Sequence, residues 1–122
     1  MRSLTILYVE DHKLLLSHVR EMLSAQGWQV ETCQNATSAL ERIESESPYD
    51  VLIFDESLPD MSVLELVRRT RSLTQRRRTP IIILSASYSA RGVLRAGADV
   101  SLRKPDEVST IIPTIKGLVG LC

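Results

Sequence analysis

Short apolar stretches alternate with longer amphipathic ones along the whole chain. The short stretches are rich in aliphatic and β-branched residues, and they cover residues 4–9, 30–33, 51–54, 81–84 and, more weakly, 100–102. Three of them are almost continuously apolar, which is typical of parallel strands buried on both faces of a sheet. Each short stretch therefore predicts a strand.

The longer stretches repeat apolar residues at intervals of three and four, which places those residues on one face of a helix. Four such stripes are Leu15, Val19, Met22 and Leu23; Ala36, Ala39, Leu40 and Ile43; Val63, Leu66, Val67 and Thr70; and Val108, Ile111, Ile112 and Ile115. Residues 90–96 fit a brief helix that ends at Gly97, a natural C-cap. Five strand–helix repeats predict an α/β fold, with a parallel sheet covered by helices on both faces.

Length, charge and cysteine content narrow the classes of protein that this pattern allows. The chain has 122 residues, enough for one domain and too few for two. Basic and acidic residues number 15 each, which gives no general reason to expect nucleic-acid or membrane binding. No signal peptide or membrane-spanning run is apparent. Cys33 and Cys122 lack metal-type spacing and indicate free thiols in a reducing cytosol, so we expect a cytoplasmic protein.

Polar residues collect where the predicted strands end, which is where open α/β sheets bind ligands. They are Glu10, Asp11, Asp55, Ser85 and Lys104. Carboxylates held together repel one another unless a cation is present, and oxygen ligands suit a hard ion such as Mg²⁺. A carboxylate can also act as a nucleophile and form an aspartyl phosphate, a reaction that needs positive charge near the phosphoryl oxygens. The set is therefore suited to reversible phosphorylation of Asp55.

The same residues lie in five short motifs: ILYVED at 6–11, DESLPDM at 55–61, LSA at 84–86, AGAD at 96–99 and KP at 104–105. Each motif alone is weak, but their order and spacing are specific. Through them the sequence resembles, over essentially its whole length, the receiver domains of bacterial two-component response regulators. We therefore predict one receiver domain over residues 1–122. Its fold would be a flavodoxin-like (βα)5 three-layer sandwich with a five-stranded parallel sheet in the order 2-1-3-4-5.

The resemblance implies a role for each residue of the phosphorylation site. Asp55 matches the phospho-acceptor, Ser85 the switch hydroxyl, and Lys104 the lysine that contacts the phosphoryl group. The family's bond before Pro105 is typically cis. The donor would be a histidine kinase or a phosphotransfer protein, and the signal would pass to an effector domain or protein. Such a domain catalyses its own phosphotransfer and autodephosphorylation without being a conventional turnover enzyme.

The resemblance also implies a Mg²⁺ site. Glu10 and Asp11 match the family's acidic pair, in which glutamate at the first position is a common variant. Together with Asp55 and the backbone carbonyl of Ser57, they would hold the ion. The sequence does not identify the oligomeric state, and a homodimer stays an open alternative.

Four departures from the family pattern fall mostly away from this site. The interval from Ser85 to Lys104 is about one helical turn short, given roughly 3.6 residues per turn. Ser101 replaces the usual switching aromatic residue on the fifth strand. Pro113 predicts a kink or a late start of the last helix, and Ser62 replaces a common glycine and predicts an N-cap. We hypothesise normal phosphorylation and an atypical surface of fourth helix, fifth strand and fifth helix.

Other functions remain open at this level. A degenerate receiver could act as a phosphorylation-independent protein-interaction module, which the altered surface favours and the intact acidic residues oppose. A phosphatase with an aspartyl nucleophile would need a further acid–base aspartate and a cap domain, for which the chain has no room. A flavin-nucleotide binder would need a phosphate loop after the first strand, and none is present.

Two features outside the motifs each allow a functional and a purely structural interpretation. His12 follows the acidic pair and could be a third metal ligand or a proton carrier, although a residue of the first helical turn is favoured. Six arginines cluster between residues 68 and 78: Arg68, Arg69, Arg71, Arg76, Arg77 and Arg78. They could contact an acidic partner or nucleic acid. A solvated helix end, cationic in favour of the helix dipole, is the preferred interpretation, and we expect no direct nucleic-acid binding.

Overall fold

Five parallel strands form the central sheet of the computed structural model, which describes residues 3–86 and 91–121. The strands are β1 (Thr5–Val9), β2 (Gln29–Cys33), β3 (Val51–Asp55), β4 (Ile81–Ser85) and β5 (Val100–Arg103), and their order in the sheet is β2-β1-β3-β4-β5. Every residue of β3 and β4 is buried, because helices cover both faces of the sheet. The predicted strand order is confirmed.

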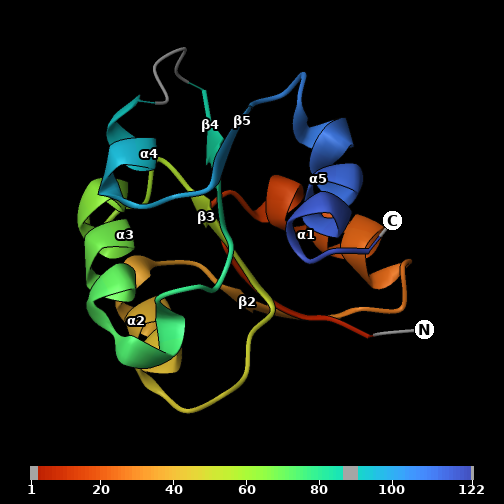
Figure 1. Ribbon diagram of the computed structural model, residues 1–122. Coiled ribbons are helices and arrows are strands. Elements are labelled where there is room, and N and C mark those ends of the chain that lie inside the picture. Colours follow the sequence, from red (N-terminus) through yellow and green to blue (C-terminus); the bar gives the residue numbers. More distant parts are fainter. Residues whose placement is uncertain (1–2, 87–90, 122) are drawn as a thin grey trace.

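The helices divide between the two faces of the sheet (Figure 1). On one face lie α2 (Ala36–Glu44), α3 (Val63–Ser72) and α4 (Arg91–Ala96); on the other lie α1 (Lys13–Ser24) and α5 (Ile111–Leu118). Two short 3-10 turns, Thr74–Arg76 and Val108–Thr110, follow α3 and precede α5. Each face has its own apolar core, to which successive strand residues contribute in alternation. The predicted three-layer flavodoxin-like fold is confirmed.

Several helix boundaries follow from capping residues in the sequence. The Ser62 side chain accepts a hydrogen bond from the Leu64 backbone N–H over 3.2 Å, so the predicted N-cap of α3 is confirmed. Helix α5 begins only at Ile111, which leaves Pro113 in the first turn, where its missing N–H costs no helical hydrogen bond. The prediction of a late start is therefore confirmed. Ala90, where the sequence placed the start of the fourth helix, lies outside the described residues.

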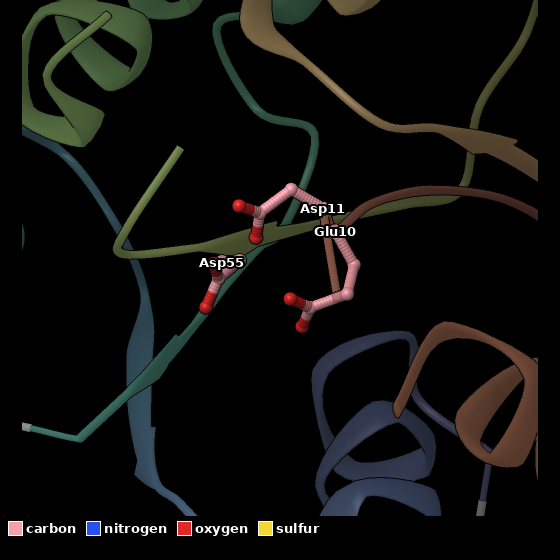
Figure 2. A group of neighbouring side chains, drawn as sticks. All are labelled: Glu10, Asp11 and Asp55. Carbon is pink, nitrogen blue, oxygen red and sulfur yellow. The ribbon is translucent and has the colours of Figure 1, made fainter. Parts of the chain in front are cut away.

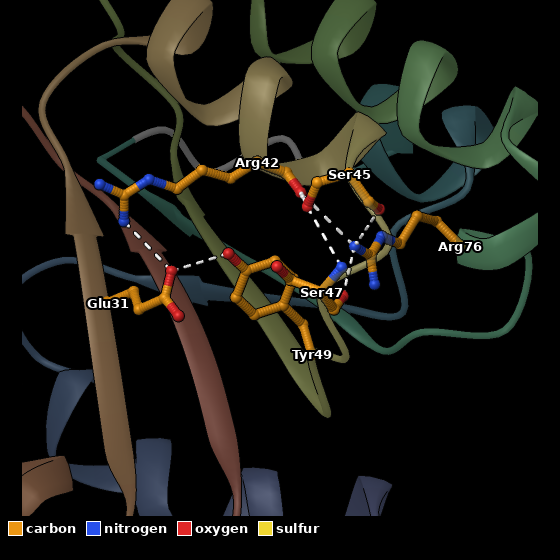
Figure 3. A network of polar contacts seen from close by, with 6 residues as sticks. All are labelled: Glu31, Arg42, Ser45, Ser47, Tyr49 and Arg76. Carbon is orange, nitrogen blue, oxygen red and sulfur yellow. Dashed lines mark hydrogen bonds and ion pairs between the residues drawn. The ribbon is translucent and has the colours of Figure 1, made fainter.

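Arg76 is a buried anchor at the end of the molecule opposite the β-strand carboxyl ends (Figure 3). Its guanidinium donates to the backbone carbonyls of Ile43 (2.9 Å), Ser45 (3.1 Å) and Ser47 (2.6 Å), and lies 5.0 Å from the centre of the Tyr49 ring. These carbonyls belong to the last turn of α2 and the loop after it, which otherwise have few donors available. Arg76 therefore ties the C-terminal end of α2 to the turn after α3.

Arg71 similarly ties α3 to the loops that precede β4 and β5. It donates to the carbonyls of Thr79 (2.7 Å) and Gly97 (2.9 Å) and pairs with the Asp99 carboxylate at 2.9 Å. Gly97 has a φ of +125°, and a Cβ there would lie 2.7 Å from the Arg71 side chain, so this turn requires glycine. The interpretation of the arginine cluster as solvated is therefore wrong for Arg71 and Arg76.

Candidate functional site

The topology brings the polar residues that follow the strands to one edge of the sheet. Asp55 is the last residue of β3 and Ser85 the last of β4, while Glu10 and Lys104 directly follow β1 and β5. Because all the strands are parallel and β1, β3, β4 and β5 are successive neighbours, these four positions lie at the same end. The backbone N–H of Lys104 donates to the Ser85 carbonyl over 2.7 Å, which continues the pairing of β4 with β5 up to the site.

Three carboxyl groups meet at this edge (Figure 2). Glu10, Asp11 and Asp55 each offer a carboxylate oxygen, and these oxygens all lie within 4.8 Å of one another. Glu10 and Asp55 are almost fully buried, at 0% and 1% exposure, whereas Asp11 is exposed. A cluster of carboxylate oxygens is a donor set for a hard divalent cation, so the residues fit a metal ion.

Lys104 lies against the two buried carboxylates. Its Nζ donates to Asp55 Oδ1 over 2.5 Å and is 3.8 Å from Glu10 Oε1. The Lys104–Pro105 peptide bond is cis, as the resemblance implies. One ammonium beside three carboxylates leaves a surplus of negative charge, and this surplus favours a cation or a proton at the site.

Glu10 is held at both of its carboxylate oxygens. The Tyr8 hydroxyl donates to Oε1 over 3.1 Å, and the backbone N–H of His12 donates to Oε2 over 3.2 Å. Burial, and then the nearby Asp55 carboxylate, raise the pKa of Glu10 above its ordinary value. Burial together with the Glu10 carboxylate also raises the pKa of Tyr8, whose hydroxyl therefore remains a hydrogen-bond donor.

Sequence reasoning did not single out Tyr8, although a signal was present. Side chains alternate along a strand, so Tyr8 and Glu10, two positions apart, are placed on the same side of the chain. A hydroxyl within an otherwise aliphatic buried strand also needs a hydrogen-bond partner. His12, the alternative metal ligand, is instead the N-cap of α1, and its Nδ1 accepts a hydrogen bond from the Leu15 N–H over 3.2 Å.

The other residues that the sequence analysis named differ in their exposure and in their place in the fold. Ser85 is 2% exposed at the end of β4, and Ser57 is exposed in the loop after β3. Ser101 is half-buried on β5, where it pairs with Ile83 in the sheet register. Cys33 is a buried free thiol, and Cys122 lies outside the described residues.

Comparison with known families identifies the class of protein. The family described as the response regulator receiver domain matches residues 6–116, and the chain belongs to this family. It is therefore a two-component signalling protein with a receiver fold. In residues 3–86 and 91–121 no helix is both long and apolar enough to cross a bilayer.

The curated relatives that the chain matches include proteins about twice its length and one of about the same length. The chain is 36% identical over 118 residues to the phosphate regulon transcriptional regulatory protein PhoB of Rhizobium meliloti, covering 93% of this chain and 51% of that protein. It is 27% identical to the polar-differentiation response regulator DivK of Brucella anthropi, covering 95% of this chain and 96% of that protein. The chain spans about half the length of several curated relatives that it matches, from 44% to 51%.

Solved structures share the whole fold. The chemotaxis response regulator CheY4 of Vibrio cholerae superposes with a TM-score of 0.89 at 28% identity, covering 96% of this chain and 99% of that one. The receiver domain of the sensor histidine kinase PA1611 from Pseudomonas aeruginosa superposes with a TM-score of 0.87 at 27% identity, covering 98% and 99% of the two chains. That structure is described as having a magnesium ion coordinated in its active site cleft.

Proposed function

We propose that residues 1–122 form a receiver domain that accepts a phosphoryl group on Asp55 and passes the signal to an effector domain or protein. The donor is a phosphohistidine on a histidine kinase or a phosphotransfer protein. The observation that carries the proposal is the arrangement around Asp55, whose buried carboxylate lies in an acidic cluster and contacts the Lys104 ammonium. In this proposal the domain works in the cytoplasm and does not itself bind nucleic acid.

Glu10, Asp11, Asp55 and the backbone carbonyl of Ser57 are the proposed Mg²⁺ ligands. A bound ion would supply positive charge that offsets the three carboxylates and stabilises the charge of an incoming phosphate. The clustering of the three carboxylate oxygens within 4.8 Å supports this assignment. The magnesium described for the receiver domain of PA1611 supports the choice of metal by similarity.

The chain's own residues divide the work of phosphoryl transfer. A carboxylate oxygen of Asp55 attacks the phosphorus, the P–N bond to the donor imidazole breaks, and the imidazole leaves with the electron pair. Lys104, already 2.5 Å from Asp55, pairs with the phosphoryl oxygens as charge develops there. The Ser85 hydroxyl donates a hydrogen bond to the bound phosphoryl group, and hydrolysis of the acyl phosphate later resets the domain.

Output through an atypical surface is the finer part of the proposal. The interval from Ser85 to Lys104 is about one helical turn short of the family pattern, and half-buried Ser101 stands where the resemblance implies a switching aromatic ring. Serine cannot fill the space that Ser85 would leave on moving toward a phosphoryl group. These two features also favour the alternative, a degenerate receiver that binds its partner without phosphorylation.

Intact mass spectrometry separates the two functions. After incubation with Mg²⁺ and acetyl phosphate, the wild-type protein should gain the mass of one phosphoryl group, while Asp55→Asn and a sample with excess EDTA should not. No gain in the wild type would favour the interaction module. NMR shifts on phosphorylation then test the output surface, and a large rearrangement of α4 and α5 like that of an aromatic switch would contradict the atypical face.

A further inference from the structure

Tyr8 places a phenol hydroxyl inside the core between β1 and the helices α1 and α5. The residue is fully buried, and aliphatic side chains such as Ile6, Ile53 and Leu84 form much of the same core. A buried hydroxyl is costly unless it has a hydrogen-bond partner. Its partner is Glu10, whose Oε1 accepts from it over 3.1 Å.

This hydrogen bond is one of two that fix the Glu10 carboxylate. A glutamate has one more rotatable bond than an aspartate, so holding its carboxylate in one place costs more side-chain entropy. Tyr8 holds Oε1 from the core, and the His12 backbone N–H holds Oε2 from the start of α1. Glu10 thus keeps an oxygen within 4.8 Å of those offered by Asp11 and Asp55.

Tyr8 also competes with Lys104 for the same oxygen. Glu10 Oε1 lies 3.8 Å from Lys104 Nζ, beyond hydrogen-bond length, while Nζ is 2.5 Å from Asp55 Oδ1. Without the Tyr8 hydroxyl, the shortest way to satisfy Oε1 is for Glu10 to close on Lys104. That movement would shift the Glu10 carboxylate from its present position and divide the Lys104 ammonium between Glu10 and Asp55.

We propose that Tyr8 is a positioning residue of the metal site, acting through Glu10 to hold its carboxylate beside Asp11 and Asp55 and to leave Lys104 on Asp55. This inference rests on the proposed function, because the cluster is taken to bind Mg²⁺. The inference adds Tyr8 to the residues on which Mg²⁺ binding depends, and it assigns the positioning of Glu10 to the Tyr8 hydroxyl and not to the aromatic ring.

The chain offers a matched control for removal of this hydroxyl. Tyr49 is also buried, at 7% exposure, and its hydroxyl donates to the Oε1 of another glutamate, Glu31, over 2.7 Å. Tyr8→Phe and Tyr49→Phe therefore delete the same kind of hydrogen bond, one at the acidic cluster and one at the β2 edge. Urea unfolding of both variants measures their loss of stability and verifies that both fold.

Calorimetric titration with Mg²⁺ is the first measurement. Tyr8→Phe should raise the Kd for Mg²⁺ about three- to tenfold, which is the fold-change that the loss of one neutral hydrogen bond supporting a ligand corresponds to. Tyr49→Phe should leave the Kd unchanged. In phosphorylation with acetyl phosphate, Tyr8→Phe should raise the half-saturating Mg²⁺ concentration by the same factor, a change that loss of stability alone does not produce.

A double-mutant cycle tests whether Tyr8 acts through Glu10. Glu10→Asp keeps an acid but draws the carboxylate back by one methylene, out of reach of the Tyr8 hydroxyl. In that background, Tyr8→Phe should no longer change the Kd. An unchanged Kd in Tyr8→Phe, equal weakening in both tyrosine variants, or an undiminished effect in the Glu10→Asp background would each overturn the inference. Failure of the wild type to bind Mg²⁺ would overturn the proposed function instead.

Discussion

The two ends of the sheet both bury charged groups, but they satisfy them in opposite ways. At the carboxyl end, the buried carboxylates of Glu10 and Asp55 lie against the ammonium of Lys104, and the exposed carboxylate of Asp11 lies beside them. At the other end, the buried guanidinium of Arg76 is surrounded by backbone carbonyls that have no charge of their own (Figure 3). The acidic end therefore carries a surplus of negative charge, whereas at the other end the hydrogen bonds of the Arg76 guanidinium are satisfied within the protein.

This difference distinguishes a site suited to binding a ligand of opposite charge from a buried charge that only stabilises the fold. A cluster of like charges raises the free energy of the folded protein until a ligand of opposite charge arrives. A buried cation with several carbonyl partners stabilises the fold and offers nothing to a ligand. Removing a carboxylate charge from the cluster of Glu10, Asp11 and Asp55 should therefore raise stability, whereas removing the charge of Arg76, or of another hydrogen-bonded group, should lower it. The following changes test this difference.

The largest effect is expected at Arg76. Arg76→Met keeps much of the apolar stem but leaves the carbonyls of Ile43, Ser45 and Ser47 without this donor, and should lower the free energy of unfolding by about 3 kcal/mol. Urea unfolding followed by circular dichroism measures the loss. Arg77→Met, at an exposed neighbouring position, is the control and should change stability by less than about 0.5 kcal/mol. Equal losses in the two variants would contradict the role of Arg76.

A smaller loss of stability is expected on substitution of Asp60, an exposed residue near the acidic edge whose carboxylate oxygens both accept hydrogen bonds. It accepts hydrogen bonds from the backbone N–H groups of Ala36 and Thr37, each over 2.8 Å, and from the Thr37 hydroxyl over 2.6 Å. The Thr37 hydroxyl, and then the Ala36 N–H, lower the pKa of Asp60 to about 2. With allowance for solvent screening, Asp60→Asn should cost about 1 kcal/mol at pH 7.

The contribution of Asp60 to the free energy of unfolding should depend on pH, and the direction follows from its lowered pKa. Because the folded-state pKa of Asp60 lies below the unfolded value of 3.8, its contribution is complete above about pH 4 and is lost as the pH falls toward 2. The stability difference between Asp60→Asn and the wild type should close over that range. Glu10 should behave oppositely, since its raised pKa means that protonation favours the folded state as the pH falls toward 4.5. A difference at Asp60 that does not change with pH would show that the charge is not responsible.

The smallest change in the free energy of unfolding is expected at Asp11, and it should be an increase, opposite in sign to the changes at Arg76 and Asp60. Without metal, Asp11→Asn removes repulsion from Glu10 and Asp55 and should stabilise the protein by about 0.5 kcal/mol at low salt, a value reduced by solvent screening. Addition of Mg²⁺ at tenfold its Kd should stabilise the wild type by about 1.4 kcal/mol and the variant by much less, which reverses their order. Thermal unfolding with and without Mg²⁺ measures both quantities. A variant less stable than the wild type without metal would contradict the surplus of negative charge.

Much of the fold could be predicted from sequence because its signals are local. Buried strands appear as continuous apolar runs, and helices appear as stripes at intervals of three and four. Ser62 and Pro113 fixed two helix starts through backbone hydrogen bonding within one turn. The positions of Glu10, Asp55 and Lys104 at strand ends followed from the repeat itself, because a parallel sheet brings those ends to one edge.

The contacts of the arginines could not be predicted in this way. Arg76 meets the carbonyl of Ser47 across 29 positions, and Arg71 meets that of Gly97 across 26 positions, so neither contact leaves a pattern in nearby residues. In the sequence the six arginines look alike, and the helix dipole favours those in the last turn of α3, Arg69 and Arg71, without distinguishing a buried guanidinium from a solvated one. Only the packing of α2 and α4 against α3 decides which guanidinium is buried.

The amino-acid sequence by itself determined the order of the elements and the residues of the acidic edge, because periodicity and strand ends are properties of neighbouring positions. Tertiary structure alone decided how the buried charges are satisfied: Glu10 by Tyr8 and His12 at one end, and Arg76 by carbonyls of distant loops at the other. The physical reason is that a hydrogen bond depends on distances of about 3 Å between particular atoms, and only the folded chain sets those distances.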